Sequence, residues 1–251
     1  MQKDNWFQIE NYLYKNQASV SEINYPAFFN TDTYEWTKLL TTNYKIFLEE
    51  FESYTSNNSV QPYFNSIQSA NSGKWKTLPL ITWNIKRRYL KSFSKTKKIL
   101  ANIPGLVSAS FSLLEAGGEI LEHRGDTDAH IRTHICLYTS KDFSQAAFTV
   151  DTETAHWHTG QCLLFCDAHF HSGYNHSNEN RLIMIIDVLH PEYLNKKNII
   201  CSKVLAGLVI NYLLIFLKLF KLNAITRFIF CGIYVFFQFI FRFIMYINIT
   251  L

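Results

Sequence analysis

The sequence predicts a mainly β domain, built as a sandwich or barrel, with helices before it and an apolar helical tail after it. Between residues 75 and 190, short runs rich in β-branched and aromatic residues alternate with Gly, Asp, Asn or Ser, as strands alternate with turns. From residue 196 onward the chain is dominated by two long apolar runs. A length of 251 residues suits one substantial domain with an appendage.

Residues 1–74 are expected to flank the domain. The first 20 residues are polar and predict a loosely held lead-in. A helix is predicted near residues 32–52, where apolar side chains recur at helical spacing, with Asp32 as its N-cap. The polar stretch after it, punctuated by Pro and Gly, predicts loops, and residues 89–103 form a second helix candidate with a basic face.

The β domain is predicted to span residues 75–195 and the tail residues 196–251. The tail contains two long apolar runs and no Asp or Glu. A pair of core helices is the alternative, but the lack of acidic residues and of an amphipathic pattern favours membrane association. A single span, a hairpin and an interfacial orientation all fit this pattern. The lysines that would hold the body on the cytoplasmic side are Lys196, Lys197 and Lys203.

The charge distribution argues against a nucleic-acid-binding body. The chain has 24 Lys and Arg and a net charge of +4, but seven of these cations follow residue 195, which leaves 17 against all 20 Asp and Glu. The N-terminus lacks the apolar run of a secretory signal, and the five cysteines contain no CxxC pair. Reduced thiols are therefore expected, rather than a zinc or redox pair at Cys162 and Cys166.

All nine histidines lie between His123 and His190, which predicts a histidine-dependent site in this part of the chain. The stretch HIRTH has an i, i+4 pair, but it lacks the Glu of a zinc protease and resembles a strand rather than a helix. Two HxH pairs would each place both rings on one strand face, a spacing common in metal-binding barrels. These pairs are His156 with His158 and His169 with His171.

Strand parity in HIRTHICLY places Arg132 and His134 on one face, opposite a row of residues suited to a core. Two such side chains on the inward face of a barrel indicate an anion in its lumen. Arg181 opens the strand RLIMIIDVL, and at the rim of such a strand it also requires an anionic partner.

Three stretches follow one another in a known order and spacing: SLLEAGGEILEHRGDTDAHIRTHICL, WHTGQCLLFCDAHFHSGYN and RLIMIIDVLHPEY. Together, residues 112–192 resemble the aspartyl/asparaginyl β-hydroxylase family. The resemblance implies a double-stranded β-helix, also called a jelly roll and similar to the cupins, that uses Fe(II) together with 2-oxoglutarate and O₂.

By position, the resemblance implies that His123 and His171 bind the iron. Arg181, ten residues after His171, would pair with the distal carboxylate of 2-oxoglutarate. The remaining residues of the co-substrate pocket would be Ser112, Arg132, His134 and, as a weaker match, Trp75.

The implied iron site has no acidic ligand, because the carboxylate position of the common His-x-Asp motif is Gly125 here. The resemblance implies that water fills this position, with Asp126, one residue out of register, as a minor candidate. Asp128 and His169 depart from the family pattern and are expected to bear on the substrate. His190 in HPEY is expected to be structural.

The resemblance implies hydroxylation of an unactivated C–H bond. Aspartyl or asparaginyl β-hydroxylation of a peptide or protein is expected first, and a membrane-anchored hydroxylase of lipid A acyl chains, which fits the apolar tail, is the alternative. A non-catalytic cupin-like binding protein is a further possibility, against which the complete set of His123, His171 and Arg181 argues. A zinc-binding cupin-like protein that uses the HxH pairs would be distinguished by its metal content.

Overall fold

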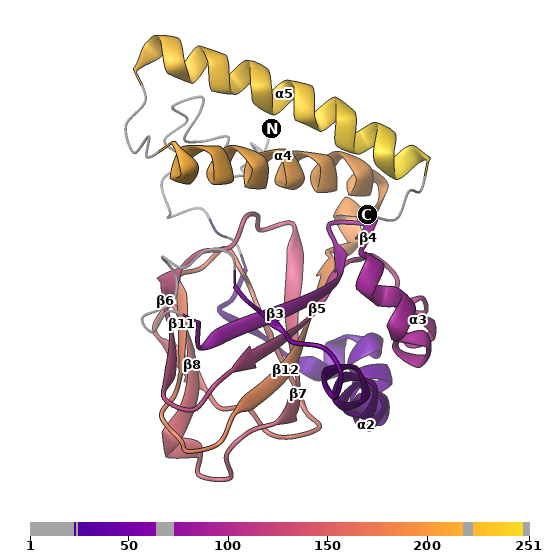
Figure 1. The fold of residues 1–251 in the computed structure, drawn as a ribbon, viewed down its shortest axis with the longest axis vertical. Coiled ribbons are helices and arrows are strands. Elements are labelled where there is room, and N and C mark those ends of the chain that lie inside the picture. The colour runs from indigo at the N-terminus through magenta and orange to yellow at the C-terminus, as the bar shows by residue number, and fades with distance from the viewer. Residues whose placement is uncertain (1–22, 24, 64–72, 218–222, 248–251) are drawn as a thin grey trace.

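The computed structural model describes residues 23, 25–63, 73–217 and 223–247. Figure 1 shows two facing β-sheets, helices on the outside of one sheet, and a pair of long helices at the C-terminal end. The lead-in predicted for residues 1–20 and part of the predicted loop, residues 64–72, lie outside the described residues.

The larger sheet has eight antiparallel strands in the order β1-β10-β7-β12-β5-β3-β2, with β4 paired to β3. These strands are β1 (Phe28–Phe29), β2 (Gln61–Pro62), β3 (Trp75–Thr82), β4 (Ile85–Lys86), β5 (Leu106–Leu114), β7 (His130–Tyr138), β10 (Cys162–Phe165) and β12 (Arg181–Leu189).

The smaller sheet has four strands in the order β6-β11-β8-β9. They are β6 (Gly118–His123), β8 (Ala146–Val150), β9 (Glu153–Ala155) and β11 (His171–Asn175). From β5 to β8, and again from β10 to β12, successive strands alternate between the two sheets, which is the connectivity of a double-stranded β-helix. The predicted fold is confirmed.

Strand alternation on β5 shows how the sequence builds this domain. Ala109 and Phe111 face the helices on the outer side of the larger sheet, where they join the main hydrophobic core. Ser108, Ser110 and Ser112 face the space between the sheets. An apolar outer face and a polar inner face are the reverse of a simple water-facing sheet, because here the outer face is covered by helices.

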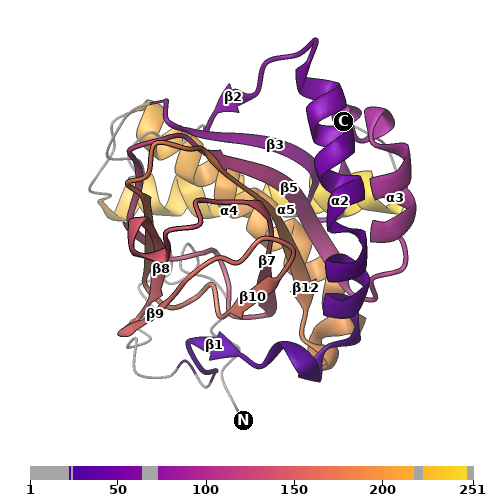
Figure 2. The ribbon, with the colours of Figure 1, turned by 90° about the horizontal axis from the view of Figure 1, so that it is seen from below.

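Two helices provide that cover (Figure 2): α2 (Glu35–Thr55) and α3 (Ser94–Leu100). The ring of Phe51 on α2 lies 4.9 Å from that of Phe111. Glu50 of α2 accepts hydrogen bonds from the Lys95 and Thr96 amides, at 2.9 and 2.8 Å, and so caps the first turn of α3.

The start of the first predicted helix requires a correction. Residues Thr31–Thr33 form a separate 3₁₀ turn, η2, so that α2 begins at Glu35. Asn30, and not Asp32, caps this turn, and Tyr34 precedes α2 without a side-chain cap. The second helix candidate divides into a 3₁₀ turn, η4 (Arg88–Ser92), and α3.

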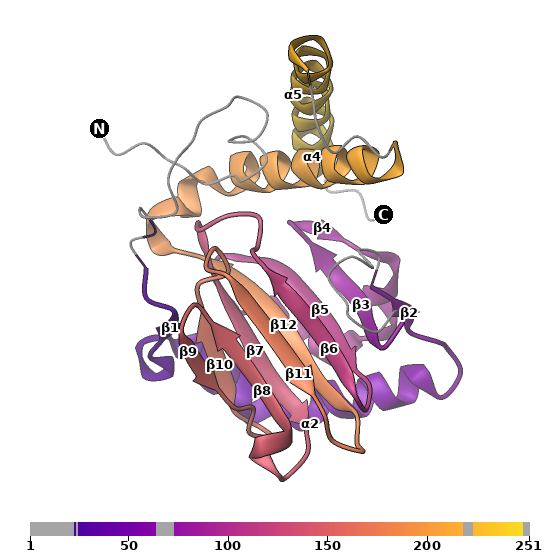
Figure 3. The same ribbon diagram turned by 90° about the vertical axis from the view of Figure 1, so that its left-hand side faces the viewer.

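The tail follows a 3₁₀ turn, η6 (Pro191–Lys196), and forms α4 (Lys197–Phe216) and α5 (Ala224–Tyr246). Both helical segments are long and apolar enough to cross a membrane, by length and composition. Figures 1 and 3 show α4 between the β domain and α5. The large exposed apolar side chains of α5 are Ile225, Phe228, Ile229, Val235, Phe236, Phe239, Phe243 and Tyr246.

The first half of α4 packs against the β domain rather than standing apart from it. It contributes Ile200, Cys201, Val204 and Leu205 to a cluster with residues of the body that include Trp83, Val107 and Leu189. The second half of α4 packs on α5 through Ala206 and Ile210. The tail predicted to start at residue 196 therefore supplies part of a hydrophobic core shared with the domain.

This packing predicts a difference between two identical substitutions in the tail. Ile200 is fully buried, so Ile200→Ala is expected to lower the free energy of unfolding of the whole chain by about 2–4 kcal/mol. Ile225→Ala removes the same atoms from a side chain that is 73% exposed and is expected to change it by less than about 0.5 kcal/mol. Urea unfolding in detergent micelles measures both, and equal effects would contradict the docking of α4.

Candidate active site

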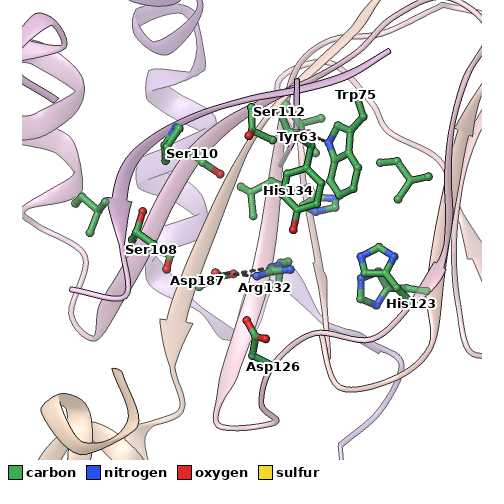
Figure 4. Close-up of a pocket in the computed structure, with 18 of the residues that line it drawn as sticks. Tyr63, Trp75, Ser108, Ser110, Ser112, His123, Asp126, Arg132, His134 and Asp187 are labelled. Carbon is green, nitrogen blue, oxygen red and sulfur yellow. Dashed lines mark hydrogen bonds and ion pairs between the residues drawn. The ribbon is translucent and has the colours of Figure 1, made fainter. Parts of the chain in front are cut away.

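A cavity of about 350 Å³ lies between the two sheets (Figure 4). Strands β3, β5, β7 and β12 line it from the larger sheet, and β6, β8 and β11 line it from the smaller sheet. The seven residues predicted from the sequence as site residues all line this cavity: Trp75, Ser112, His123, Arg132, His134, His171 and Arg181.

His123 and His171 lie opposite each other on the paired strands β6 and β11, with ring centroids 4.3 Å apart. The Nδ1 of His123 is 2.8 Å from the Leu121 carbonyl oxygen, and that of His171 is 2.9 Å from the His169 carbonyl oxygen. A carbonyl only accepts, so each Nδ1 donates and each Nε2 keeps its lone pair.

The protonation of this pair suits a divalent metal ion. Burial lowers the pKa of both imidazoles, and that of His171 falls to about 4, so both rings are neutral at physiological pH. A neutral ring whose Nδ1 is fixed by a carbonyl, with Nε2 left free, is the usual state of a metal-binding histidine. The two residues therefore fit Fe(II), which accepts imidazole ligands.

The carboxylate of Asp167 lies beside this pair, in the loop between β10 and β11. Its Oδ1 is 3.6 Å from Nε2 of His171. A Cβ atom at Gly125 would lie only 1.5 Å from Asp167 Oδ2, so glycine is the residue that permits this close approach. Within the described ranges, no group of three His, Cys, Asp or Glu side chains is arranged to hold a metal ion, and Asp126 lines the cavity without completing one.

Arg132 holds Asp167 in this position. Its guanidinium donates to both carboxylate oxygens of Asp187, at 2.8 and 3.0 Å, and to Asp167 Oδ1 at 2.6 Å. Burial alone would lower the pKa of Arg132, but the carboxylates of Asp167 and Asp187 raise it by more than burial lowers it. The pKa of Arg132 therefore lies above its usual value. Strand parity predicted an anion for the inward-facing Arg132, and the protein supplies two such anions itself.

Arg181 differs from Arg132 because it has no anionic partner among the described residues. It is 1% exposed, its Nε has no hydrogen-bond partner, and none of the ion pairs among the described residues includes it. Its guanidinium lies 4.5 Å from the centre of the Trp157 ring, and Nη2 is 3.5 Å from the Ser112 hydroxyl. Burial lowers its pKa to about 10, so it stays charged at neutral pH.

Two tryptophans fix the polar side chains that lie beside Arg181, which are Ser112 and His134. Trp75 donates its indole N–H to the Ser112 hydroxyl at 3.0 Å, and Trp157 donates to Nδ1 of His134 at 3.3 Å. An indole N–H only donates, so His134 carries its proton on Nε2. Burial, and then the neighbouring arginines, lower the pKa of His134 well below its usual value, so it is a neutral donor.

The cavity has two unlike ends, which the strand register defines. Ser112 pairs with Ile183 near the Arg181 end, whereas Ser108 pairs with Asp187 near the other. At this second end the cavity reaches Leu208 of α4. One end therefore presents an unpaired buried cation, and the other end reaches the apolar tail.

Residues 41–191 match the family described as Aspartyl/Asparaginyl beta-hydroxylase. The chain belongs to this family. It is thus a member of a hydroxylase family.

The relatives of this chain include enzymes with different names and different substrates in those names. An ornithine lipid ester-linked acyl 2-hydroxylase of Rhizobium tropici is 28% identical over 177 residues, which cover 68% of this chain and 63% of that protein. The human aspartyl/asparaginyl beta-hydroxylase is 29% identical over 128 residues, which cover 48% of this chain and 16% of that protein. The chain thus spans less than two thirds of these relatives.

Among solved structures, an oxidoreductase of the 2OG-Fe(II) oxygenase family from Burkholderia pseudomallei is similar, with a TM-score of 0.44 and 10% identity. The match covers 57% of this chain and 78% of that one.

Sequence reasoning missed several residues of this hydroxylase site. Trp157 and Asp167 stood within the recognised motifs, in WHTG and FCD, but were given no role. Asp187 is the single acidic residue in RLIMIIDVL, and this interruption of an apolar strand was the available signal. Tyr63, whose ring lies 4.0 Å from that of Trp75, comes from a stretch predicted only as loop.

The HxH pairs do not form a joint metal site in the part of the chain that is described. His171 lines the cavity, but Nε2 of its partner His169 contacts the Tyr25 carbonyl oxygen at 2.9 Å. Neither His169 nor Asp128 is among the described residues that line the cavity. His190 stacks on Tyr25, with ring centroids 4.1 Å apart, as a packing residue would.

The contact between Gly125 and Asp167 predicts that Gly125→Ala is strongly destabilising. The new methyl group displaces a buried carboxylate from Arg132, which is expected to cost about 3–5 kcal/mol and to weaken metal binding. Gly232→Ala on α5 is the control, because nothing lies within 4 Å of the added carbon. Urea unfolding and metal titration measure the effects, and similar behaviour of the two variants would contradict the assignment.

The buried histidines predict that the metal-free protein loses stability in acid. Burial lowers the pKa of His130, His134 and His190, the last to about 4. The pKa of a histidine in the unfolded chain is about 6.5, and below this pH the unfolded chain binds more protons than the folded one. The free energy of unfolding therefore decreases as the pH is lowered, by up to ~1.4 kcal/mol per pH unit for each histidine. Burial raises the pKa of Asp126 to about 7, so this residue alone would make the folded protein more stable as the pH is lowered. This effect of one residue is smaller than the sum over the three histidines.

The urea midpoint measured with a chelator should therefore fall between pH 7 and pH 5. His190→Phe keeps a ring against Tyr25 and should show a smaller fall. A midpoint that is constant or rises over this range would show that the histidines are not held neutral by the fold.

Proposed function

We propose that this chain is a membrane-bound hydroxylase of a lipid acyl chain, dependent on Fe(II) and 2-oxoglutarate. The observation that carries the proposal is Arg181, a buried cation for which the described residues supply no anionic partner, at one end of a cavity that also holds two neutral imidazoles. A buried charge is costly unless it is paired, so this site favours a ligand that brings its own carboxylate.

Each predicted site residue has a role in this proposal. His123 and His171 hold Fe(II) through Nε2, and the metal with 2-oxoglutarate and O₂ supplies the oxidant that converts C–H to C–OH. Arg181 binds the distal carboxylate of 2-oxoglutarate through its planar guanidinium. Ser112 and His134 offer further hydrogen bonds beside it.

Arg132 and Trp75 act less directly in this scheme. Arg132 positions Asp167 beside His171, where its carboxylate would accept a hydrogen bond from a water molecule in the cavity. Trp75 fixes the Ser112 hydroxyl. Trp157 fixes the proton of His134 on Nε2 and covers one face of the Arg181 guanidinium, which keeps water away from it.

A lipid substrate is supported by the end of the cavity that reaches the apolar tail helix α4. A second cavity of about 270 Å³, lined by residues of α4, α5 and β4, shares Thr82, Arg87 and Leu208 with the first. An apolar chain that leaves the metal site in this direction meets the tail helices rather than open water. The name of the Rhizobium relative, which covers more of the chain than the human relative does, agrees with this direction.

The peptide or protein substrate expected first from the sequence is less well supported than the lipid alternative. Its support is the family description and the human relative, of which the chain spans 16%. Membrane attachment rests on the tail, where the exposed side chains of α5 include Phe228 at 80% and Tyr246 at 85%. The lysines at the start of α4 favour a body on the cytoplasmic side.

The full chain in detergent micelles, supplied with Fe(II), ascorbate and 2-oxoglutarate, is expected to add one oxygen to an acyl lipid, with one succinate formed per product. Mass spectrometry of the lipid beside an Asp- and Asn-containing peptide decides between the two substrates. Oxidation of the peptide alone would refute the lipid proposal.

Arg181→Lys keeps the charge but loses the planar fork, so the KM for 2-oxoglutarate is expected to rise about 10–100-fold. Arg88→Gln is the control, because Arg88 is exposed and pairs with Tyr89 outside the cavity. An unchanged KM in Arg181→Lys would remove Arg181 from the co-substrate site.

A further inference from the structure

Two opposite charges that line the active-site cavity have no salt-bridge partner among the residues that the structure describes. Arg87, on the turn after β4, lines both cavities, and its Nε has no hydrogen-bond partner. Asp126, in the loop between β6 and β7, lines the first cavity and takes part in none of the side-chain hydrogen bonds or ion pairs of the described residues. By contrast, Arg132 and Asp187 neutralise each other.

The elements around Arg87 contain no group that could neutralise it. Strand β4, turn η4 and helices α4 and α5 have no Asp or Glu, and no acidic residue occurs between Glu52 and Glu115. An unpaired guanidinium in a half-buried site is stabilised by an anion, and this anion must come from outside the surrounding elements.

Asp126 lacks the corresponding cation. Burial, and then the nearby Asp167 carboxylate, raise its pKa to about 7, even though Arg132 acts in the opposite direction. Figure 4 shows Asp126 beyond the Arg132–Asp187 pair, on the side away from Trp75. It therefore lies outside the 2-oxoglutarate end of the cavity, on the side from which a substrate would approach the metal.

We propose that Arg87 and Asp126 select the head group of the lipid, and that this head is zwitterionic, with a carboxylate held by Arg87 and an ammonium group held by Asp126. The inference rests on the proposed lipid hydroxylase function. The acyl segment next to the head then lies between these residues and the His123–His171 pair. The remaining apolar part lies in the second cavity, against Leu205, Val209 and Phe241 of the tail.

A phosphate head without a cationic group fits this site less well. It would match Arg87, but it would leave Asp126 unpaired and would bring a second negative charge towards it. A lipid head that carries both a carboxylate and an ammonium group, as an amino acid does, satisfies both residues together.

The test is equilibrium binding without O₂, measured as the change in tryptophan fluorescence, because Trp75 and Trp83 both line the cavity. The probes are ornithine lipid, its carboxyl methyl ester and its N-acetyl derivative, each in nonionic micelles with the full chain loaded with Fe(II) and 2-oxoglutarate. Wild type is expected to bind the first lipid about tenfold more tightly than either derivative. Arg87→Gln should lose only the preference over the ester, and Asp126→Asn only the preference over the N-acetyl form.

Arg88→Gln and Asp151→Asn are the matched controls, because both residues are exposed and neither is among those that line the cavities, and they should keep both preferences. Wild type without a preference, or variants that retain both, would overturn the inference. Loss of iron from Asp126→Asn would do so as well, because Asp126 would then be a metal ligand. Binding is measured without turnover, so this test decides the head-group inference whether or not the lipid is hydroxylated. Failed hydroxylation in the activity test would refute only the proposed function.

Discussion

The placement of one carboxylate, Asp167, organises the metal side of this protein. It lies in the space that any side chain at position 125 would need, it accepts from Arg132, and it stands 3.6 Å from the imidazole of His171. Through Arg132 it is linked to Asp187, so the loop after β6, the loop after β10 and strands β7 and β12 meet at one buried ionic network. Such a network is stable only while every member has its partner, which makes its geometry strict.

The two arginines in the cavity illustrate how partners decide what a charge does. Arg132 and Arg181 both project inward from strands of the larger sheet, and the sequence gives no reason to separate them. In the fold, Arg132 is neutralised by Asp167 and Asp187, whereas Arg181 is left with a tryptophan face and a serine hydroxyl. The first arginine therefore stabilises the site, and the second is the one that we propose to bind the carboxylate of a ligand.

Much of this arrangement could be predicted from local sequence pattern. Short strands punctuated by turn residues predicted the β domain, strand parity predicted that Arg132 and His134 face inward, and motif spacing selected His123, His171 and Arg181 for their roles, which stay predictions. The contact of Gly125 with Asp167 could not be predicted in this way, because it joins loops that are 42 positions apart and depends on a gap with no side chain. The same holds for α4, whose uniform apolarity does not distinguish a face for the body from a face for lipid.

Helix α4 packs on both the β domain and α5, and these contacts have a consequence for the cavity. One end of the cavity between the sheets is lined by Leu208, and the helix that carries Leu208 packs against the domain on one side and against α5 on the other. Helix α4 thus forms part of the core of the domain. Deletion of the tail would expose Val107 and Leu189 to solvent. In the proposed membrane-bound enzyme, a shift of α4 caused by bilayer thickness or composition would also change the shape of the cavity, which would link substrate choice to the surrounding membrane.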